Sequence, residues 1–171
     1  MRVSPHPHAW QTGHYPWRSM SADTPAVPEA HLVVGYDGSP PAVRALKSAA
    51  RLLTVRPGRI TVVWVAHLTS TVELSADAVA IVEQDFDQVA VELKAGAGKL
   101  LAASGIPWDF RWRQGLIAHE LIAEAESIQA ARPDDVVAIV VGSSSSATHR
   151  LVGSVAVNLA RHSPVPVTIV P

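Results

Sequence analysis

The carboxy-terminal segment constrains the fold more than any other part of this sequence. An apolar run, Val136–Val141, ends at Gly142 and leads into a loop of small polar residues. The pair Gly153-Ser154 then opens a helical pattern, and a second apolar run, Val165–Val170, follows it. In α/β folds a buried strand, a small-residue loop and a helix start form an anion site, because loop N–H groups and the helix N-terminus point at the same space. The segment therefore predicts a nucleotide-binding α/β domain.

Composition narrows the class of protein further. A chain of 171 residues with 48% hydrophobic content can build one domain with a sizeable core. The net charge is −1 and the basic residues are scattered, so the basic patch of a nucleic-acid-binding surface is not expected. There is no cysteine, which excludes disulfides and thiolate zinc sites. Without a signal-like apolar start or a run of about 18 apolar residues, we expect a cytoplasmic protein with no membrane contact.

The first thirty residues differ in composition from the rest. Residues 1–30 carry five of the 13 prolines and show no hydrophobic period, which predicts a disordered tail before a domain spanning 31–171. Trp10, Tyr15 and Trp17 leave open the alternative that the tail docks on the domain or on a partner.

Within the domain, short apolar runs alternate with helical patterns. The expected strands are 31–36, 60–68, 108–115, 136–141 and 165–170, and the expected helices are 40–53, 77–104, 116–131 and one starting at 154. Right-handed crossovers turn this order into an open, doubly wound parallel sheet with helices on both faces.

Several residues predict local features of these elements. Ser39 suits the N-cap position of the first helix, with a proline in the first turn. Gly96 and Gly98 lie inside the second helical pattern and predict a weak point or kink there. Alternating large apolar and polar side chains over 108–115 predict an edge strand.

The position of a ligand follows from the fold class. In doubly wound sheets, ligands bind beyond the carboxyl ends of the strands, where the winding reverses. Three loops are expected to meet there: Tyr36–Ser39, Val65–Leu68 and Gly142–Ser154.

Four pieces of the sequence together resemble the universal stress protein family. They read VVGYDGS (33–39), VVWV (62–65), VVGS (140–143) and GSVAVNLARHSPVPVTIV (153–170). The resemblance covers roughly residues 31–171. It implies a five-stranded sheet of order 3-2-1-4-5, cytoplasmic location, a role in stress response and frequent homodimers. Many members of the family bind ATP or AMP, with or without Mg²⁺, while another branch binds no nucleotide.

The resemblance also implies site residues. The nucleotide-binding branch carries a glycine, two residues, a second glycine, nine residues and a Gly-Ser/Thr pair. Gly142 matches the first glycine and Gly153-Ser154 match the final pair. Asp37 matches an acid that contacts adenosine, and Val65 matches the adenine-side residue at the end of the second strand.

The phosphate loop departs from this pattern in two ways. Ser145 stands where the middle glycine is expected, and only residues 146–152 separate it from Gly153, two fewer than in the pattern. Both departures bear on triphosphate binding more than on adenosine recognition. The hydroxyls of Ser143–Ser146 can face a phosphate, or the run can be a plain flexible loop.

Each of the other site residues also has a purely structural interpretation. Asp37 can accept hydrogen bonds from an adenine amino group or a ribose hydroxyl, or it can simply form the turn before a helix. Gly142 can let a ligand approach the backbone at positive φ, or it can make a tight turn. Ser154, with Gly153, can offer N–H groups to an anion or can serve as an N-cap.

Two classes of function remain. The sequence has neither a GxxxxGK[ST] loop nor a GxGxxG motif, and no nucleophile with an evident base, so we do not expect an enzyme. The first hypothesis is a regulatory protein that binds ATP or AMP, and the alternative is an interaction module of the same fold without nucleotide. In either case a homodimer is predicted through Val165–Val170, because an apolar edge strand invites pairing with a second chain.

Overall fold

The computed structural model describes residues 28–66, 76–143 and 153–171, with the backbone alone for 76–84. The predictions for the tail up to residue 27 and for Leu68 and Ser145 therefore lie outside the described residues. Five strands and four helices alternate in the described part: β1 (Ala30–Gly35), α1 (Pro40–Leu52), β2 (Gly58–Ala66), α2 (Ala76–Leu101), β3 (Trp108–Gln114), α3 (Ile117–Ala131), β4 (Val136–Gly142), α4 (Ser154–His162) and β5 (Val167–Val170).

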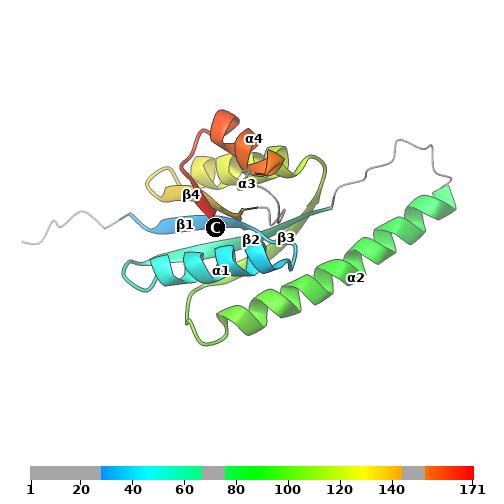
Figure 1. The fold of residues 1–171 in the computed structure, drawn as a ribbon, viewed down its shortest axis with the longest axis horizontal. Helices are drawn as coiled ribbons and strands as arrows, with labels where there is room; N and C mark the ends of the chain where they lie inside the picture. The colour runs from blue at the N-terminus through cyan, green and yellow to red at the C-terminus, as the bar shows by residue number, and fades with distance from the viewer. Residues whose placement is uncertain (1–27, 67–75, 144–152) are drawn as a thin grey trace, which may run out of the picture.

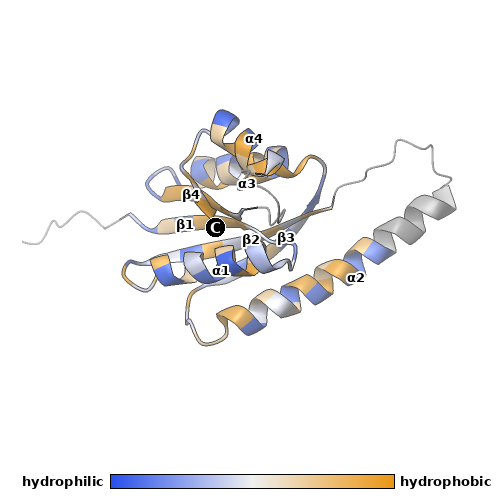
Figure 2. Cartoon of the chain, in the orientation of Figure 1, coloured by the Kyte–Doolittle hydropathy of each residue, from blue (hydrophilic) through white to orange (hydrophobic). Residues whose placement is uncertain are grey.

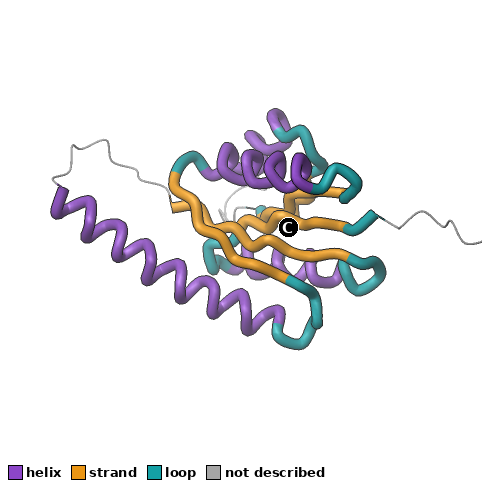
Figure 3. The backbone as a smooth tube through the Cα atoms, turned by 180° about the vertical axis from the view of Figure 1, so that it is seen from behind, coloured by secondary structure: helices purple, strands orange, loops and turns teal. Residues whose placement is uncertain are grey.

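The strands form one parallel sheet in the order β3-β2-β1-β4-β5. Helices α1 and α2 cover one face, and α3 and α4 cover the other (Figures 1 and 3). The predicted open, doubly wound α/β sheet of order 3-2-1-4-5 is confirmed. The edge position predicted for β3 is also confirmed, because among the described strands β3 pairs only with β2. The winding reverses between β1 and β4, so the carboxyl ends of these two strands mark the expected ligand position.

The core has two halves, one on each face of the sheet. Successive side chains of a strand point to opposite faces, so Leu32 and Val34 of β1 pack under α1 and α2, while Val33 packs under α3 and α4. Strands buried on both faces need continuous apolar runs, which is why β1 and β4 read without alternation. Figure 2 shows hydrophobic and hydrophilic colours mixed along α1, as expected for a helix with one buried face.

The start of α1 has the predicted cap. Ser39 is the N-cap residue, and its hydroxyl accepts a hydrogen bond from the backbone N–H of Ala42 at 3.4 Å. Prolines fill the first two helical positions, where a missing N–H costs nothing. This cap fixes the position at which the chain leaves β1 and turns back over the sheet.

The kink predicted in α2 is wrong, because the helix runs without interruption through Gly96 and Gly98 to Leu101. A Cβ on Gly96 would lie 3.3 Å from the Tyr36 hydroxyl, and one on Gly98 would lie 3.4 Å from the ring of Trp108. The close approach of α2 to Tyr36 therefore favours glycine at position 96, whereas a Cβ at position 98 would make only an ordinary contact.

Two element boundaries also differ from expectation. Strand β1 begins at Ala30, one residue before the predicted start of the domain. Strand β5 begins at Val167 and not at Val165, because Pro164 and Pro166 have no N–H to donate to the sheet. The carbonyl of Pro166 still accepts a hydrogen bond from the N–H of Ile139 at 2.9 Å.

Candidate functional site

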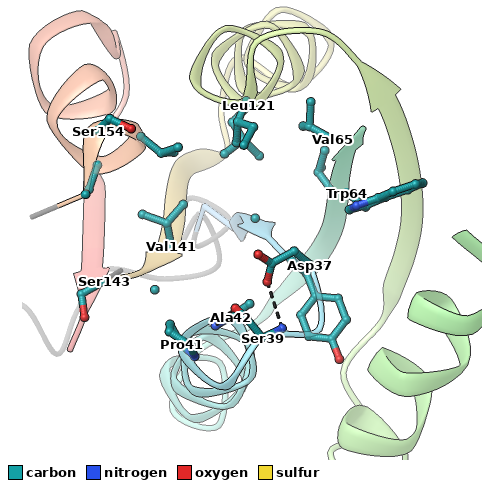
Figure 4. Close-up of a pocket in the computed structure, with 18 residues that line it drawn as sticks. Asp37, Ser39, Pro41, Ala42, Trp64, Val65, Leu121, Val141, Ser143 and Ser154 are labelled. Atoms are coloured by element: carbon teal, nitrogen blue, oxygen red, sulfur yellow. Dashed lines mark hydrogen bonds between the residues drawn. The ribbon is translucent and has the colours of Figure 1, made fainter. Parts of the chain in front are cut away.

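A cavity of about 380 Å³ opens at the carboxyl ends of β1, β2 and β4 (Figure 4). The first turns of α1, α3 and α4 complete its wall. The lining residues are Gly35, Tyr36, Asp37, Ser39, Pro41, Ala42, Val63, Trp64, Val65, Ile117, Leu121, Val141, Gly142, Ser143, Gly153, Ser154, Val155 and Ala156. The cavity lies at the switch in winding direction, where this class of sheet binds its ligands.

The structure brings together six of the seven residues that the sequence singled out. Asp37, Val65, Gly142, Ser143, Gly153 and Ser154 all line the cavity, and Ser145 lies outside the described residues. In Figure 4, Asp37 lies toward the β1–β2 side and the two serines lie on the side of β4 and α4. The parts predicted for adenosine and for phosphate thus face the same space from opposite sides.

Sequence reasoning missed the third wall of the cavity, which α3 provides. Ile117 and Leu121 both line the cavity, and Leu121 is fully buried. They lie four residues apart in the first two turns of α3, so they share one face of the helix. An apolar i, i+4 pair directly after a strand was the available signal, but only the sheet order shows that this helix end lies over β1 and β2.

Asp37 combines the structural interpretation with the functional one. Its Oδ1 accepts a hydrogen bond from the backbone N–H of Ser39 at 3.0 Å, which closes the turn before α1. The side chain is exposed at the cavity, and Oδ2 has no partner among the described residues. One oxygen therefore holds the turn while the other stays available as an acceptor.

The positive φ that the sequence analysis considered for Gly142 is wrong. Its φ is not positive, since the described glycines with positive φ are Gly38, Gly105 and Gly115. A Cβ on Gly142 would instead lie 2.4 Å from the carbonyl carbon of Pro41, a distance that real Cβ atoms do not reach. The glycine lets the end of β4 pass against the first turn of α1, and the close approach is to protein backbone.

The start of α4 lacks a side-chain cap. The N-cap residue is Gly153, which has no side chain to accept a hydrogen bond from the first turn. Ser154 is the first helical residue and not the cap. The first-turn N–H groups of a helix have no intrahelical partner, and together with the helix dipole they favour an anion. Since Gly153, Ser154 and Val155 line the cavity, these N–H groups lie at its wall.

Charge in the cavity is sparse. Among the described lining residues, Asp37 is the only one with an acidic or basic side chain of the Asp, Glu, Lys or Arg type. Burial, with a further contribution from the Asp37 carboxylate, raises the pKa of Tyr36, so this phenol stays neutral. Arg150, the cation that the sequence places nearest to the phosphate loop, lies outside the described residues. Within the described lining, an anion can be held only by N–H groups and hydroxyls.

The family model for the universal stress protein family matches residues 30–171. The chain belongs to the universal stress protein family. The match covers the whole domain, from the first residue of β1 to the last residue of the sequence. A search of curated proteins found no match.

Solved structures of universal stress proteins share the fold. The protein from Lactobacillus plantarum is 18% identical with a TM-score of 0.67, and the match covers 84% of this chain and 99% of that one. A universal stress protein in complex with cAMP is 23% identical with a TM-score of 0.59, covering 85% and 99%. A family protein from Arabidopsis thaliana with AMP bound is 12% identical with a TM-score of 0.56, covering 82% and 90%.

This universal stress protein also contains a buried polar chain that sequence reasoning missed. The Thr61 hydroxyl donates to Asp109 Oδ1 at 2.8 Å, so it must accept its second bond, also 2.8 Å, from His31 Nε2. His31 therefore carries a proton on Nε2, and its Nδ1 is buried without a partner among the described residues. Burial, and then the nearby Arg59, lowers the pKa of His31.

The chain continues to helix α3 through the edge strand. Arg111 Nε donates to Asp109 Oδ2 at 2.9 Å, and its Nη1 donates to Glu124 Oε1 at 2.7 Å. Arg113 Nη2 donates to the second oxygen of Glu124 at 2.5 Å. The Glu124 side chain is fully buried, and both of its oxygens are paired. None of these residues lines the cavity, and no cluster of three metal-ligating side chains occurs in the part of the chain that the structure describes.

The search for membrane-spanning segments was negative: across the described residues, no helix combines the length and the apolar character needed to cross a bilayer.

Proposed function

We propose that this universal stress protein binds an adenine nucleotide, ATP or AMP, in the cavity at the strand ends and acts as a regulator in stress response, not as an enzyme. The observation that carries the proposal is the convergence of Asp37 and Val65 with the uncapped start of α4 on one cavity. Universal stress proteins with the same fold bind cAMP and AMP, which supports this ligand class.

The adenosine end of the ligand is assigned to the β1–β2 side of the cavity. The free oxygen of Asp37 can accept a hydrogen bond from a ribose hydroxyl or from the adenine amino group. Val63, Val65 and Leu121 supply an apolar surface for the base. Pockets of this kind pair mostly apolar walls with a few placed polar groups, as here.

The phosphate end is assigned to Gly142, Ser143 and the first turn of α4. Because the described lining offers N–H groups and hydroxyls without a cation, phosphate recognition is expected to be modest. Ser145 in place of the family's second glycine points the same way. We expect dissociation constants in the micromolar range or above, with Mg²⁺ required for none of the adenosine contacts.

Two substitutions at one position separate the roles of Asp37. Asp37→Asn keeps an oxygen that can accept from the Ser39 N–H, so the turn survives, but it removes the carboxylate charge. Asp37→Ala removes both the acceptor for the Ser39 N–H and the carboxylate charge. Thermal melts with AMP, ATP and GTP should show a shift with adenine nucleotides, since a ligand at 100 times its Kd adds about 2.7 kcal/mol to the free energy of unfolding.

We expect adenine nucleotide to raise the melting temperature clearly for the unchanged protein, less for Asp37→Asn, and least for Asp37→Ala. Without ligand, Asp37→Asn should melt close to the unchanged protein, whereas Asp37→Ala should melt lower. If millimolar adenine nucleotide moves none of the melts, the proposal fails and the chain belongs with the members that bind no nucleotide.

The second candidate function is an interaction module that acts as a homodimer through β5. It is favoured by the position of Val167–Val170 at the edge of the sheet, with a side opposite β4 that no described strand pairs. Exposed edges pair readily with a second chain, and a twofold axis would set the two copies antiparallel. A homodimer is compatible with nucleotide binding, so the two candidates can hold together.

A further inference from the structure

A second cavity, of about 420 Å³, lies between α3 and α4. Its lining residues are Leu116, Ile117, Ala118, His119, Ile122, Ser154, Val155, Asn158 and His162. On α4, Val155, Asn158 and His162 follow the three- and four-residue spacing of one helical face, so the cavity runs along the length of that helix. Neither the family match nor the nucleotide contacts proposed above account for it.

The second cavity adjoins the first at the proposed phosphate end. Ile117, Ser154 and Val155 line both cavities. They lie at the starts of α3 and α4, and the start of α4 is where the phosphate is assigned. A group attached to that phosphate would therefore pass over Ser154 and enter the second cavity, whereas a group on the adenine side would not.

The lining of the second cavity selects the chemistry of that group. Leu116, Ile122 and Val155 give it an apolar surface, and Leu116 is 67% exposed without such a group. Asn158 donates its amide N–H to the carbonyl of Ser154, which leaves its side-chain oxygen as an acceptor. No lysine or arginine is among the described residues that line this cavity, so a further phosphate would find no fixed positive charge there.

We propose that the second cavity holds an apolar or aromatic group carried as an ester on the phosphate of the bound adenine nucleotide. The preferred ligand is then an adenosine 5′-phosphate ester in place of a free nucleotide. This inference rests on the proposed function, because it uses the phosphate position to place the group. The ester is expected to bind more tightly than the free nucleotide because its apolar group is buried against Leu116 and Ile122.

The test compares AMP with its benzyl phosphate ester by titration calorimetry on the full chain. We expect the ester to bind about tenfold more tightly, which equals 1.4 kcal/mol. Asn158→Trp fills the second cavity from an exposed position on α4 and should abolish the advantage of the ester while AMP binds as before. Ala160→Trp is the matched control, because Ala160 is exposed on the same helix and does not line the cavity.

A second variant approaches the cavity from the other helix. Leu116→Asn changes a mostly exposed side chain, so the fold should tolerate it, and the advantage of the ester should fall at least threefold. Equal affinities for AMP and the ester on the unchanged protein would overturn the inference and leave the proposed function standing. An advantage that persists in Asn158→Trp would also overturn it, and binding of neither ligand would overturn the proposed function as well.

Discussion

Gly142 lies so close to Pro41 that a Cβ on the glycine would approach the carbonyl carbon of the proline to 2.4 Å. The contact joins the end of β4 to the first turn of α1, two elements about a hundred residues apart in the sequence. It holds two walls of the cavity at the strand ends together. The residue that the sequence presents as a ligand contact is therefore also a packing contact.

Gly142→Ala is expected to destabilise the protein, because the added methyl group meets backbone that cannot rotate away. Overpacking of this kind costs about 1–3 kcal/mol. Urea unfolding measures the change. Gly98→Ala is the matched control, since its Cβ would meet the Trp108 ring at 3.4 Å, an ordinary contact, and alanine favours the helix. Equal stabilities for the two variants would contradict the packing argument.

Glu124→Gln is expected to lower the free energy of unfolding by about 1–3 kcal/mol, the worth of hydrogen bonds to a charged group. The loss stays below that of a fully buried ion pair because the side chains of Arg111 and Arg113 are 45% and 43% exposed and can turn to water. Glu126→Gln, an exposed change on the same helix, should alter stability by less than about 0.5 kcal/mol. Denaturant unfolding of both variants at neutral pH is the measurement, and a Glu124→Gln protein as stable as the Glu126→Gln protein would show that the pairing contributes nothing.

Stability is expected to fall on mild acidification because of His31. Its folded-state pKa lies below the ordinary value of 6.5, so the folded protein binds fewer protons than the unfolded chain between the two pKa values. The free energy of unfolding therefore decreases as the pH drops through 6.5 toward the folded-state pKa, and is undiminished above 6.5. The slope is at most about 1.4 kcal/mol per pH unit.

Two cations and two carboxylates surround this histidine. Arg59 and Arg132 oppose its protonation, and Asp109 and Asp135 favour it. To isolate His31, the free energy of unfolding of the unchanged protein is compared with that of His31→Gln. Both are measured by urea unfolding at several pH values from about 7.5 to about 5. A difference that does not change over this range would disprove the prediction.

Ser145→Gly is expected to hold or raise the affinity for ATP. It restores the second glycine of the family signature, and glycine takes positive φ without the cost of roughly 1–2 kcal/mol that a Cβ imposes. Titration with ATP and with adenosine distinguishes the two ends of the ligand, because Ser145→Gly should change the affinity for ATP and leave the affinity for adenosine as it was. A fall in ATP affinity would mean that the serine hydroxyl itself contacts the phosphate.

A dimer mass is expected in light scattering at tens of micromolar protein. The carbonyl of Pro166 accepts a bond from Ile139 of β4, and that of Val170 accepts one from Ser143, directly after β4. The alternation of a strand therefore turns the N–H groups of Val167 and Ile169 toward the open edge. Val167→Pro removes one of these outward donors and should weaken the dimer, whereas Thr168→Ala, at an exposed side chain, should not. A monomer at this concentration would refute the homodimer.

The sequence was most informative where the signal is local. The Ser39 cap depends on neighbouring residues alone, and the buried strands follow from apolar runs. The strand order 3-2-1-4-5 came from the resemblance to a family, since periodicity does not state which strands pair. With that order, the meeting of Asp37 with Ser154 could be foreseen because both follow strands at the switch point.

The failures share a physical cause, which is dependence on distant neighbours. What a Cβ on Gly96 would contact depends on Tyr36, sixty residues earlier, and what a Cβ on Gly142 would contact depends on Pro41. The hydrogen bond from His31 reaches Thr61 on the next strand, and nothing in either local sequence announces it. Such relations become visible only when the elements are packed.

The pairing of Glu124 with Arg111 and Arg113 makes the two borders of the sheet unequal. On β3 these ion pairs tie the strand to α3 and keep two half-exposed arginines on the edge strand, and charged side chains on an edge strand discourage pairing with a second strand. On β5 the rim carries valine, threonine and isoleucine. If both edge strands of the sheet could pair with another chain, copies would add to one another without limit and form a fibre. When β5 is the one edge strand that can pair, two copies joined through β5 leave no further edge strand for a third, so assembly ends at a dimer.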